Sequence, residues 1–100
     1  MKKIMLVCSA GMSTSMLVTK MQKAADGRGI EAEIFAVAES EAKNHKDVQV
    51  ALLGPQVRFL KNKLEGQLAE YGTPVDIIDT VAYGTMNGEK VLDQALSLIK

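Results

Sequence analysis

The sequence has little of several features that define other protein classes. It contains one cysteine, so no internal disulfide can form, and a reducing compartment would keep the thiol available for chemistry. Apolar runs are no longer than about five residues, far short of the ~20 that cross a bilayer. Lys2 and Lys3 precede too short an apolar stretch for a signal peptide. We therefore expect a cytoplasmic protein with no direct membrane insertion.

Charge of one sign is also missing. The 12 basic residues balance the 12 acidic ones, and uncharged residues interrupt the one cluster of lysines, around Lys61 and Lys63. The sequence therefore predicts no nucleic-acid partner. The one histidine, His45, lies among polar residues and is expected to be a solvated surface side chain rather than a phosphate carrier.

The apolar pattern alternates between short continuous runs and helical spacing. In a chain of 100 residues, 47% of them hydrophobic, this pattern predicts one domain over residues 1–100, with strands and helices alternating around a parallel sheet. The expected strands are Lys3 to Val7, Glu31 to Val37, Gln49 to Leu53 and Val75 to Ile78. The first expected helix runs from about Thr14 to Ala25. The second has an apolar face made of Val57, Leu60, Leu64 and Leu68. The last helix follows the connection Asp79 to Asn87 and buries Val91, Leu92, Ala95, Leu96 and Ile99. The stretch from Glu39 to Asp47 is either a short surface helix or an irregular connection.

The charged start of the second strand indicates its place in the sheet. Glu31 and Glu33 suit an edge, because a central parallel strand is apolar on both faces. Right-handed crossovers then favour an α/β fold with an open four-stranded parallel sheet of order 2-1-3-4 and helices on both faces, a three-layer sandwich. In that order the carboxyl ends of the first and third strands border a crevice, and Cys8 lies at it.

Cys8 stands where the apolar run Ile4–Val7 meets the small, hydroxyl-rich stretch Ser9–Ser15, which opens a helix. Unpaired N–H groups at a helix N-terminus, together with the helix dipole, hold a phosphate-sized anion, so we expect neither a metal nor a cofactor. The same field favours the nucleophilic thiolate. Phosphoryl chemistry on sulfur is therefore the hypothesis, and its alternative is a buried, structural Cys8 in a non-catalytic interaction module, slow toward alkylating reagents.

The segment Cys8–Ser15 resembles two families that form phosphocysteine. They are the low-molecular-weight tyrosine phosphatases and the enzyme IIB components of the bacterial phosphotransferase system (PTS), lactose/cellobiose/chitobiose class. The phosphatase pattern C-x5-R-[ST] places an arginine where this chain has Thr14, and proline follows neither Asp76 nor Asp79 as it follows the phosphatase general acid. Hydrolysis should be poor without the guanidinium. A cysteine phosphatase is therefore the second hypothesis.

The resemblance to the IIB components extends to Leu52–Val57, Asp79–Gly84 and Gly88. It implies a fold like that of the low-molecular-weight phosphatases, a single EIIB domain and a phosphotransferase activity. In this family the cysteine accepts a phosphoryl group from a phosphohistidine of the cognate IIA protein. It passes the group to a sugar, commonly a disaccharide, bound by the membrane IIC component during uptake. By this resemblance Cys8 is the phosphoryl carrier.

The loop after Cys8 is expected to bind the phosphoryl oxygens, mainly through backbone N–H groups. Its residues are Ser9, Ala10, Gly11, Met12, Ser13, Thr14 and Ser15. Gly11 lets the backbone approach closely, and either Ser13 or Thr14 serves as the helix cap or as a ligand. Met12 packs against partner proteins or simply within the loop.

Three residues outside this loop are candidates for the wall of the site or for partner contacts. Pro55 and Gln56 start the third helix beside the crevice, although a proline near the first helical position has a purely structural explanation. Tyr83 either forms a wall near Cys8 or packs the hydrophobic rim.

Overall fold

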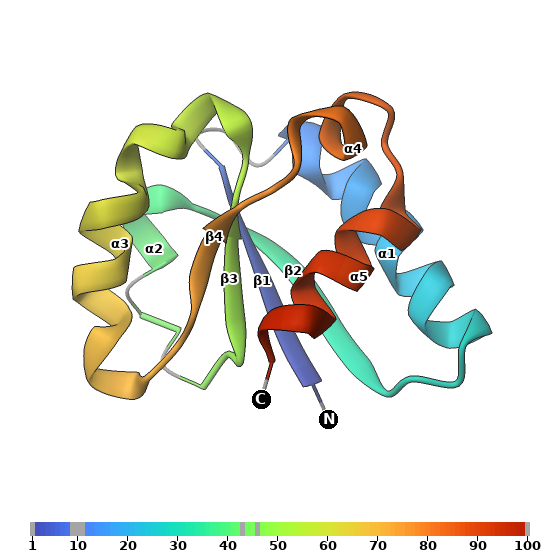
Figure 1. Cartoon of the computed structure of the whole chain (residues 1–100), viewed down its shortest axis with the longest axis horizontal. Helices are drawn as coiled ribbons and strands as arrows, with labels where there is room; N and C mark the ends of the chain where they lie inside the picture. Colours follow the sequence, from blue (N-terminus) through green and yellow to red (C-terminus); the bar gives the residue numbers. More distant parts are fainter. Residues whose placement is uncertain (1, 9–11, 43, 46, 100) are drawn as a thin grey trace.

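A parallel sheet of four strands runs through the middle of the protein in this computed structural model, which describes residues 2–8, 12–42, 44–45 and 47–99, with only the backbone of 12–14 and 39. The strands are β1 (Lys2–Cys8), β2 (Ala32–Ala38), β3 (Val50–Leu53) and β4 (Val75–Ile77). They pair in the order β2-β1-β3-β4 (Figure 1). The predicted sheet order 2-1-3-4 is therefore confirmed.

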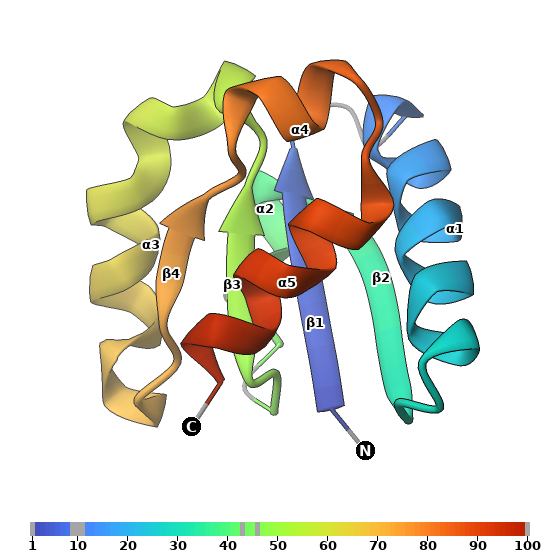
Figure 2. The same ribbon diagram turned by 45° about the vertical axis from the view of Figure 1, so that its right-hand side comes forward.

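Helices cover both faces of the sheet, as Figure 2 shows, so the predicted three layers are also confirmed. One face carries α1 (Met12–Gly27), α4 (Thr80–Gly84) and α5 (Gly88–Leu98). The other carries the single turn α2 (Glu39–Ala42), the 3₁₀ segment η1 (Pro55–Leu60) and α3 (Lys61–Leu68), which continues into the 3₁₀ turn η2 (Ala69–Tyr71). No helix in the described part of the chain has the length and apolar character needed to cross a membrane.

The two faces of the sheet build two separate clusters of buried side chains. Successive side chains of a strand point to opposite faces, so Ile4 and Leu6 of β1 join the cluster under α1 and α5, whereas Met5 and Val7 join the cluster under α3. All four are buried, as expected for a central parallel strand. β2 is an edge strand, as predicted, and Glu33 on it is exposed, although Glu31, expected to start the strand, precedes its first residue, Ala32.

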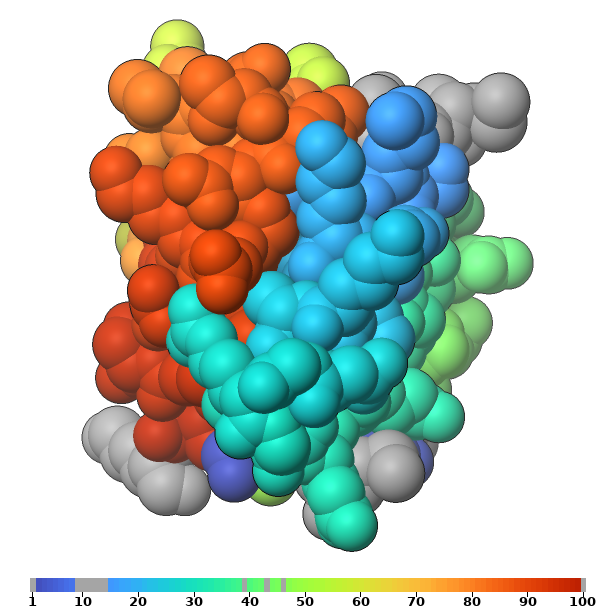
Figure 3. All heavy atoms as spheres, turned by 90° about the vertical axis from the view of Figure 1, so that its right-hand side faces the viewer, coloured from blue at the N-terminus to red at the C-terminus, as the bar shows by residue number. Residues whose placement is uncertain are grey.

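The helices α1 and α5 lie against each other over the first cluster, and Figure 3 shows this contact from outside. Gly88, the first residue of α5, is buried directly against the backbone of Lys20 and Met21 in α1. The Arg28 side chain, just beyond α1, adds a hydrogen-bonded ion pair of 2.6 Å with Asp93 of α5. This close approach explains why a residue without a side chain begins α5.

The third helix starts differently from the amphipathic helix that the sequence predicts. The chain leaves β3 through Gly54 and Pro55 into η1, where Val57 departs from helical geometry (φ −118°, ψ 23°) before α3 begins. Proline suits this first position because it lacks an N–H group and has a fixed φ. The predicted apolar face is confirmed, since Val57, Leu64 and Leu68 are buried and Leu60 is partly buried against the same cluster.

The segment between β4 and α5 forms a short helix, α4, that the sequence did not predict. Asp79 caps it by accepting a hydrogen bond of 2.9 Å from the N–H group of Ala82. The last helix ends one residue earlier than expected, because Ile99 is extended (φ −79°, ψ 127°), although its side chain still packs partly against the first cluster.

The two ends of the chain lie at the end of the sheet where the strands begin, opposite Cys8 (Figure 1). β1 begins there with Lys2, and Leu98 and Ile99 line a pocket together with Val48 and Gln49, which precede β3. The carboxyl ends of the strands therefore point away from both termini.

Candidate functional site

Cys8 is the last residue of β1 and lies at the carboxyl edge of the sheet, beside Ala38 of β2 in the strand register. The alternation along β1 places its side chain on the face of Ile4 and Leu6, which is the face that α1 and α4 cover. The residue is only 3% exposed, and Sγ lies 4.0 Å from the carbonyl oxygen of Val37. The thiol is thus buried at the carboxyl end of β1.

The crevice predicted between β1 and β3 lies where the chain segments that leave these two strands turn to opposite faces of the sheet. After β1 the chain crosses one face through α1 to reach β2, and after β3 it crosses the opposite face through η1 and α3 to reach β4. Open α/β sheets bind ligands at such a point. Gly54 follows β3 and donates its N–H to the carbonyl oxygen of Val7 at 2.9 Å, so pairing continues up to the peptide before Cys8.

Two predicted wall residues, Gln56 and Tyr83, meet at this edge. The Gln56 side-chain amide donates a hydrogen bond of 3.0 Å from Nε2 to Tyr83 Oη. A Cβ atom on Gly54 would lie 2.9 Å from Gln56 Oε1, 3.8 Å from Tyr83 Cε2 and 3.6 Å from the oxygen of Val7. The missing side chain of Gly54 therefore leaves room for the Gln56 amide, whereas the Tyr83 ring lies at ordinary contact distance from this position.

Tyr83 and Pro55 also have the structural roles considered as alternatives. Tyr83 is half-buried against the cluster under α1 and α5, so it packs the rim and reaches Gln56 at the same time. Pro55 occupies the start of η1, as its structural explanation predicts.

The phosphate-binding role of the loop after Cys8 stays a prediction. Ser9, Ala10 and Gly11 lie outside the described residues, as do the side chains of Met12, Ser13 and Thr14. α1 begins at Met12, so Ser13 and Thr14 lie in its first turn, and whether either caps the helix or binds phosphate stays a prediction. Ser15, the last residue of the predicted loop, is an exposed residue of α1.

The two aspartates considered as a general acid have structural roles. Asp79 caps α4, and Asp76 accepts hydrogen bonds from its neighbour Ile77 N–H at 2.8 Å and from Gln94 Nε2 at 3.3 Å. These hydrogen bonds agree with the sequence-based prediction that neither aspartate is a phosphatase-like general acid.

His45 differs from its prediction as a solvated surface residue. It is half-buried, and its ring centroid lies 5.0 Å from that of Phe35. Phe35 pairs in register with Met5, below the carboxyl edge where Cys8 lies. The aromatic contact shields His45 on one side, and the histidine belongs to a different part of the surface from the thiol.

Strongly exposed apolar side chains stand on the segments around the carboxyl edge. They are Met16 of α1, 61% exposed, Phe59 of η1, 76% exposed, and Val81 of α4, 67% exposed. We call these three residues the apolar rim. None of the three is among the residues that the sequence indicated for partner contacts, which were Met12, Pro55, Gln56 and Tyr83. The missed signal was an apolar residue placed off the buried face of its helix, as Met16 is beside the buried Leu17.

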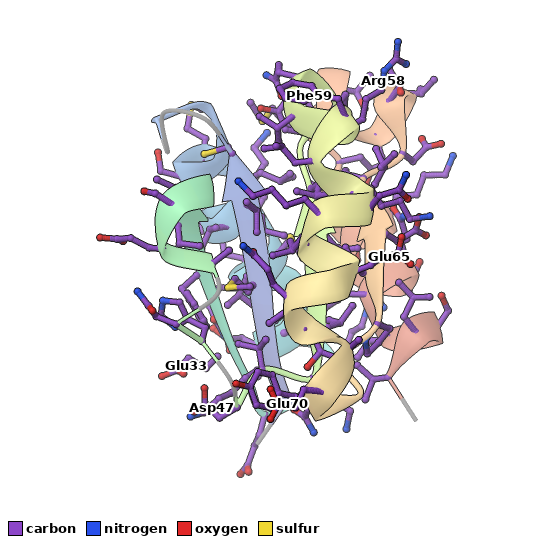
Figure 4. The ribbon with its side chains drawn as sticks, turned by 90° about the vertical axis from the view of Figure 1, so that its left-hand side faces the viewer. Glu33, Asp47, Arg58, Phe59, Glu65 and Glu70 are labelled. Atoms are coloured by element: carbon purple, nitrogen blue, oxygen red, sulfur yellow. The ribbon has the colours of Figure 1, made fainter. Side chains whose placement is uncertain are left out.

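The side chains labelled on the α3 side lie at different distances from the end of the sheet where Cys8 is placed (Figure 4). Figure 4 shows Arg58 and Phe59 at the end where β1 terminates, whereas Glu33, Asp47 and Glu70 lie at the opposite end. The carboxylates labelled at that far end are thus remote from the edge that would receive a phosphate.

Comparisons with known proteins agree with one another. The family profile described as "PTS system, Lactose/Cellobiose specific IIB subunit" matches residues 3–94. The PTS oligo-beta-mannoside-specific EIIB component of Bacillus subtilis (strain 168) is 49% identical over 100 residues, which cover 99% of this chain and 97% of the relative. The PTS cellobiose-specific EIIB component of Lactococcus lactis subsp. lactis (strain IL1403) is 44% identical over 104 residues, covering 98% and 96%.

Solved structures give the same result. The solution structure of the cellobiose-specific phosphotransferase IIB component from Borrelia burgdorferi matches with a TM-score of 0.80 and 48% identity, over 98% of this chain and 91% of that chain. The lactose-specific IIB domain from Streptococcus pneumoniae matches with a TM-score of 0.87 over 99% and 98% of the two chains. At 15% identity this second likeness supports the fold alone.

Proposed function

Because this chain belongs to the lactose/cellobiose-specific IIB family of the phosphotransferase system, whose members are sugar phosphotransferases, we propose that Cys8 carries the phosphoryl group during sugar uptake. The donor is a phosphohistidine of the cognate IIA protein. The acceptor is a sugar, commonly a disaccharide, bound by the membrane IIC component. The chain works on the cytoplasmic side, where both partners meet it.

The position of Cys8 carries this proposal. The residue ends the central strand β1 at the point where the connections diverge, and α1 begins a few residues later at Met12. The N–H groups of a first helical turn have no partner within the helix, and the helix dipole adds partial positive charge there. A phosphoryl group on Cys8 would therefore lie at the edge of the sheet where an anion is stabilised without a metal.

The reaction consists of two in-line transfers. In the first, the Cys8 thiolate attacks the phosphorus of the phosphohistidine, the S–P bond forms as the P–N bond breaks, and the imidazole nitrogen keeps the electron pair and takes up a proton. In the second, a sugar hydroxyl oxygen attacks the same phosphorus, the S–P bond breaks and the thiolate leaves, while the hydroxyl proton passes to solvent. Backbone N–H groups of the loop from Ser9 to Ser15 stabilise the charge on the equatorial oxygens.

A carrier must keep its phosphocysteine until the acceptor arrives. Thr14 occupies the position where the phosphatase pattern has arginine, so this chain lacks the guanidinium that stabilises the hydrolytic transition state. Asp76 and Asp79 are engaged in hydrogen bonds to backbone and amide groups. Slow hydrolysis follows, and it suits storage of the group rather than its loss to water.

The apolar rim is the surface that we assign to the partners. Met16, Phe59 and Val81 come from three different segments around the carboxyl edge and are exposed by more than half of their surface. IIA and IIC must both reach Cys8, so they bind this surface in turn. Each contact therefore belongs to the small, transient class of interfaces.

A non-catalytic module with a structural cysteine is the second candidate, and the 3% exposure of Cys8 is the observation that favours it. It predicts slow alkylation of the native protein by iodoacetamide at neutral pH. Prompt alkylation, in contrast, would show that the edge opens readily enough for a phosphoryl donor to reach the sulfur.

The decisive experiment is the intact mass of the protein after incubation with phosphoenolpyruvate, the general phosphotransferase proteins and the cognate IIA. We expect one added phosphoryl group on the wild type and none on Cys8→Ser. Thermal unfolding of both proteins checks that the variant is folded. An unmodified wild type, in the presence of IIA shown to be phosphorylated, would contradict the proposal, and turnover of an aryl phosphate would favour a phosphatase instead.

A further inference from the structure

The hydrogen bond between Gln56 and Tyr83 joins two segments that are far apart in the sequence. Gln56 belongs to η1, which follows β3, and Tyr83 belongs to α4, which follows β4. We propose that the Tyr83 hydroxyl donates a hydrogen bond to the phosphoryl group on Cys8 and that Gln56 is the positioning residue that orients this hydroxyl. The inference rests on the proposed function, because it concerns the phosphorylated protein.

Tyr83 lies on the same side of the sheet as the Cys8 side chain. The alternation along β1 places Cys8 on the face of Ile4 and Leu6, and Tyr83 packs against the cluster that contains both. The Tyr83 ring is also close to the end of β1. Its Cε2 atom and the carbonyl oxygen of Val7 lie 3.8 Å and 3.6 Å from the same point, the Cβ position of a residue replacing Gly54.

The backbone under Tyr83 is held on both sides. The Tyr83 N–H donates to the carbonyl oxygen of Asp79 at 2.8 Å, while the Asp79 side chain caps α4 through Ala82. The carbonyl oxygen of Ala82 in turn accepts a bond of 2.8 Å from Asn87. With the backbone fixed and the ring half-buried, the hydroxyl occupies a defined place at the rim of the site.

The hydrogen bond from the Gln56 amide determines the direction in which the Tyr83 hydroxyl donates its proton. A tyrosine hydroxyl both donates and accepts, and here the oxygen accepts from Gln56 Nε2 at 3.0 Å. A hydroxyl that accepts a hydrogen bond becomes a stronger donor, because bonds in a chain polarise one another. A phosphoryl oxygen is an acceptor of the strong, charge-assisted kind, so it competes well for the proton of Tyr83 in the phosphorylated protein.

Gly54 is part of this arrangement because it lacks a side chain. A Cβ atom there would lie 2.9 Å from Gln56 Oε1, closer than normal contact, and would displace the amide from its place beside Tyr83. Gly54 itself is fixed to β1 through its bond to the oxygen of Val7. The backbone next to Cys8 therefore fixes Gly54, Gly54 leaves room for the Gln56 amide, and this amide orients the Tyr83 hydroxyl.

The test uses the phosphorylated wild type, Tyr83→Phe, Gln56→Ala and the control Tyr71→Phe. Tyr71 is the other tyrosine of the chain and belongs to η2, so its variant removes the same hydroxyl group far from Cys8. Two quantities are measured: the rate of phosphoryl transfer from IIA to Cys8, and the ³¹P resonance of the phosphocysteine as a function of pH.

We expect Tyr83→Phe to accept the phosphoryl group but to lose about tenfold or more in transfer rate, as for a hydrogen bond to a charged group. Its ³¹P titration should move to higher pH, because the dianion loses a donor. Gln56→Ala should change both quantities in the same direction and by less. The double variant should be no worse than Tyr83→Phe, since the two residues act as one unit. Tyr71→Phe should match the wild type.

Two results would overturn the inference, and they differ from failure of the proposed function. A phosphorylated Tyr83→Phe protein with the wild-type rate and ³¹P titration would show that the pair is only a structural tie, even if its unfolding temperature falls. An effect of Gln56→Ala without any effect of Tyr83→Phe would have the same meaning. If the wild type itself accepts no phosphoryl group from phosphorylated IIA, the proposed function fails, and this inference fails with it.

Discussion

Replacing Gly88 by alanine tests the close packing of α5 on α1. The added Cβ atom would lie 2.6 Å from the carbonyl carbon of Lys20 and 2.7 Å from both Lys20 Cβ and the nitrogen of Met21. Ordinary contact begins near 3.4 Å, so the start of α5 would have to move away from α1 by about 0.8 Å. Two of the three nearest atoms belong to the α1 backbone, which cannot move aside as the end of a flexible side chain can.

The cost follows from what this displacement disturbs. Val91, Leu92 and Ala95 of α5 are buried, and a shift of the helix separates them from the cluster that they share with α1. Overpacking a core costs about 1–3 kcal/mol. The better helix propensity of alanine applies to a helix interior and returns little of this cost at the first residue of α5. We expect Gly88→Ala to lower the free energy of unfolding by about 1–3 kcal/mol. In a domain of this size, each kcal/mol corresponds to about 4–8 °C in Tm.

Urea unfolding followed by circular dichroism measures the change, with Gly66→Ala as the matched control. Gly66 is exposed within α3, and a Cβ atom there would meet nothing within 4 Å. The control should gain about 0.5–1 kcal/mol from helix propensity alone. A Gly88→Ala protein as stable as the wild type, or one stabilised like Gly66→Ala, would refute the packing argument.

Two smaller effects can be measured on the same protein. Asn87 caps α5 by accepting a hydrogen bond of 3.1 Å from the Lys90 N–H, so Asn87→Ala should lower the free energy of unfolding by about 1 kcal/mol in urea. Stability close to that of the wild type in Asn87→Ser, which keeps a capping side chain, would support the capping role. The hydrogen bond from Lys3 lowers the pKa of Asp47 below its ordinary value of 3.8. The stabilisation of the folded state by this exposed pair is therefore complete above pH 3.8 and is lost as the pH falls through the lowered pKa of Asp47. The difference in stability between wild type and Asp47→Asn should therefore be small at neutral pH and vanish in acid or in high salt. A difference that persists in acid would contradict this assignment.

The sheet was predictable because its central strands leave a plain signal. Ile4–Val7 and Val50–Leu53 are short apolar runs buried on both faces, and Glu33 marked the edge strand. The helix α4 escaped prediction because five residues make too little of a periodic pattern, and its stability depends on the Asp79 cap and the burial of Ala82. Such a helix is selected by its tertiary contacts rather than by its own sequence.

The candidate site, like the fold, was predictable from the sequence only in part. From its neighbours in the chain the sequence predicted Cys8 as the reactive residue, which stays a prediction, and it proposed Gln56 and Tyr83 as wall residues without a contact between them. That contact depends on the register that places η1 next to α4 and on the missing side chain of Gly54. A sequence pattern carries no information on either, because both arise only when segments distant in the chain are brought together.

The common location of the two chain ends has a practical consequence. Lys2 and Ile99 lie at the edge of the sheet opposite Cys8 (Figure 1). An affinity tag, a fluorescent label or a tether to a sensor surface can therefore be attached at either end and extends away from the thiol. Immobilised molecules would all present the end of the sheet with Cys8 to solution, which suits a real-time binding measurement with the IIA protein proposed above as the donor.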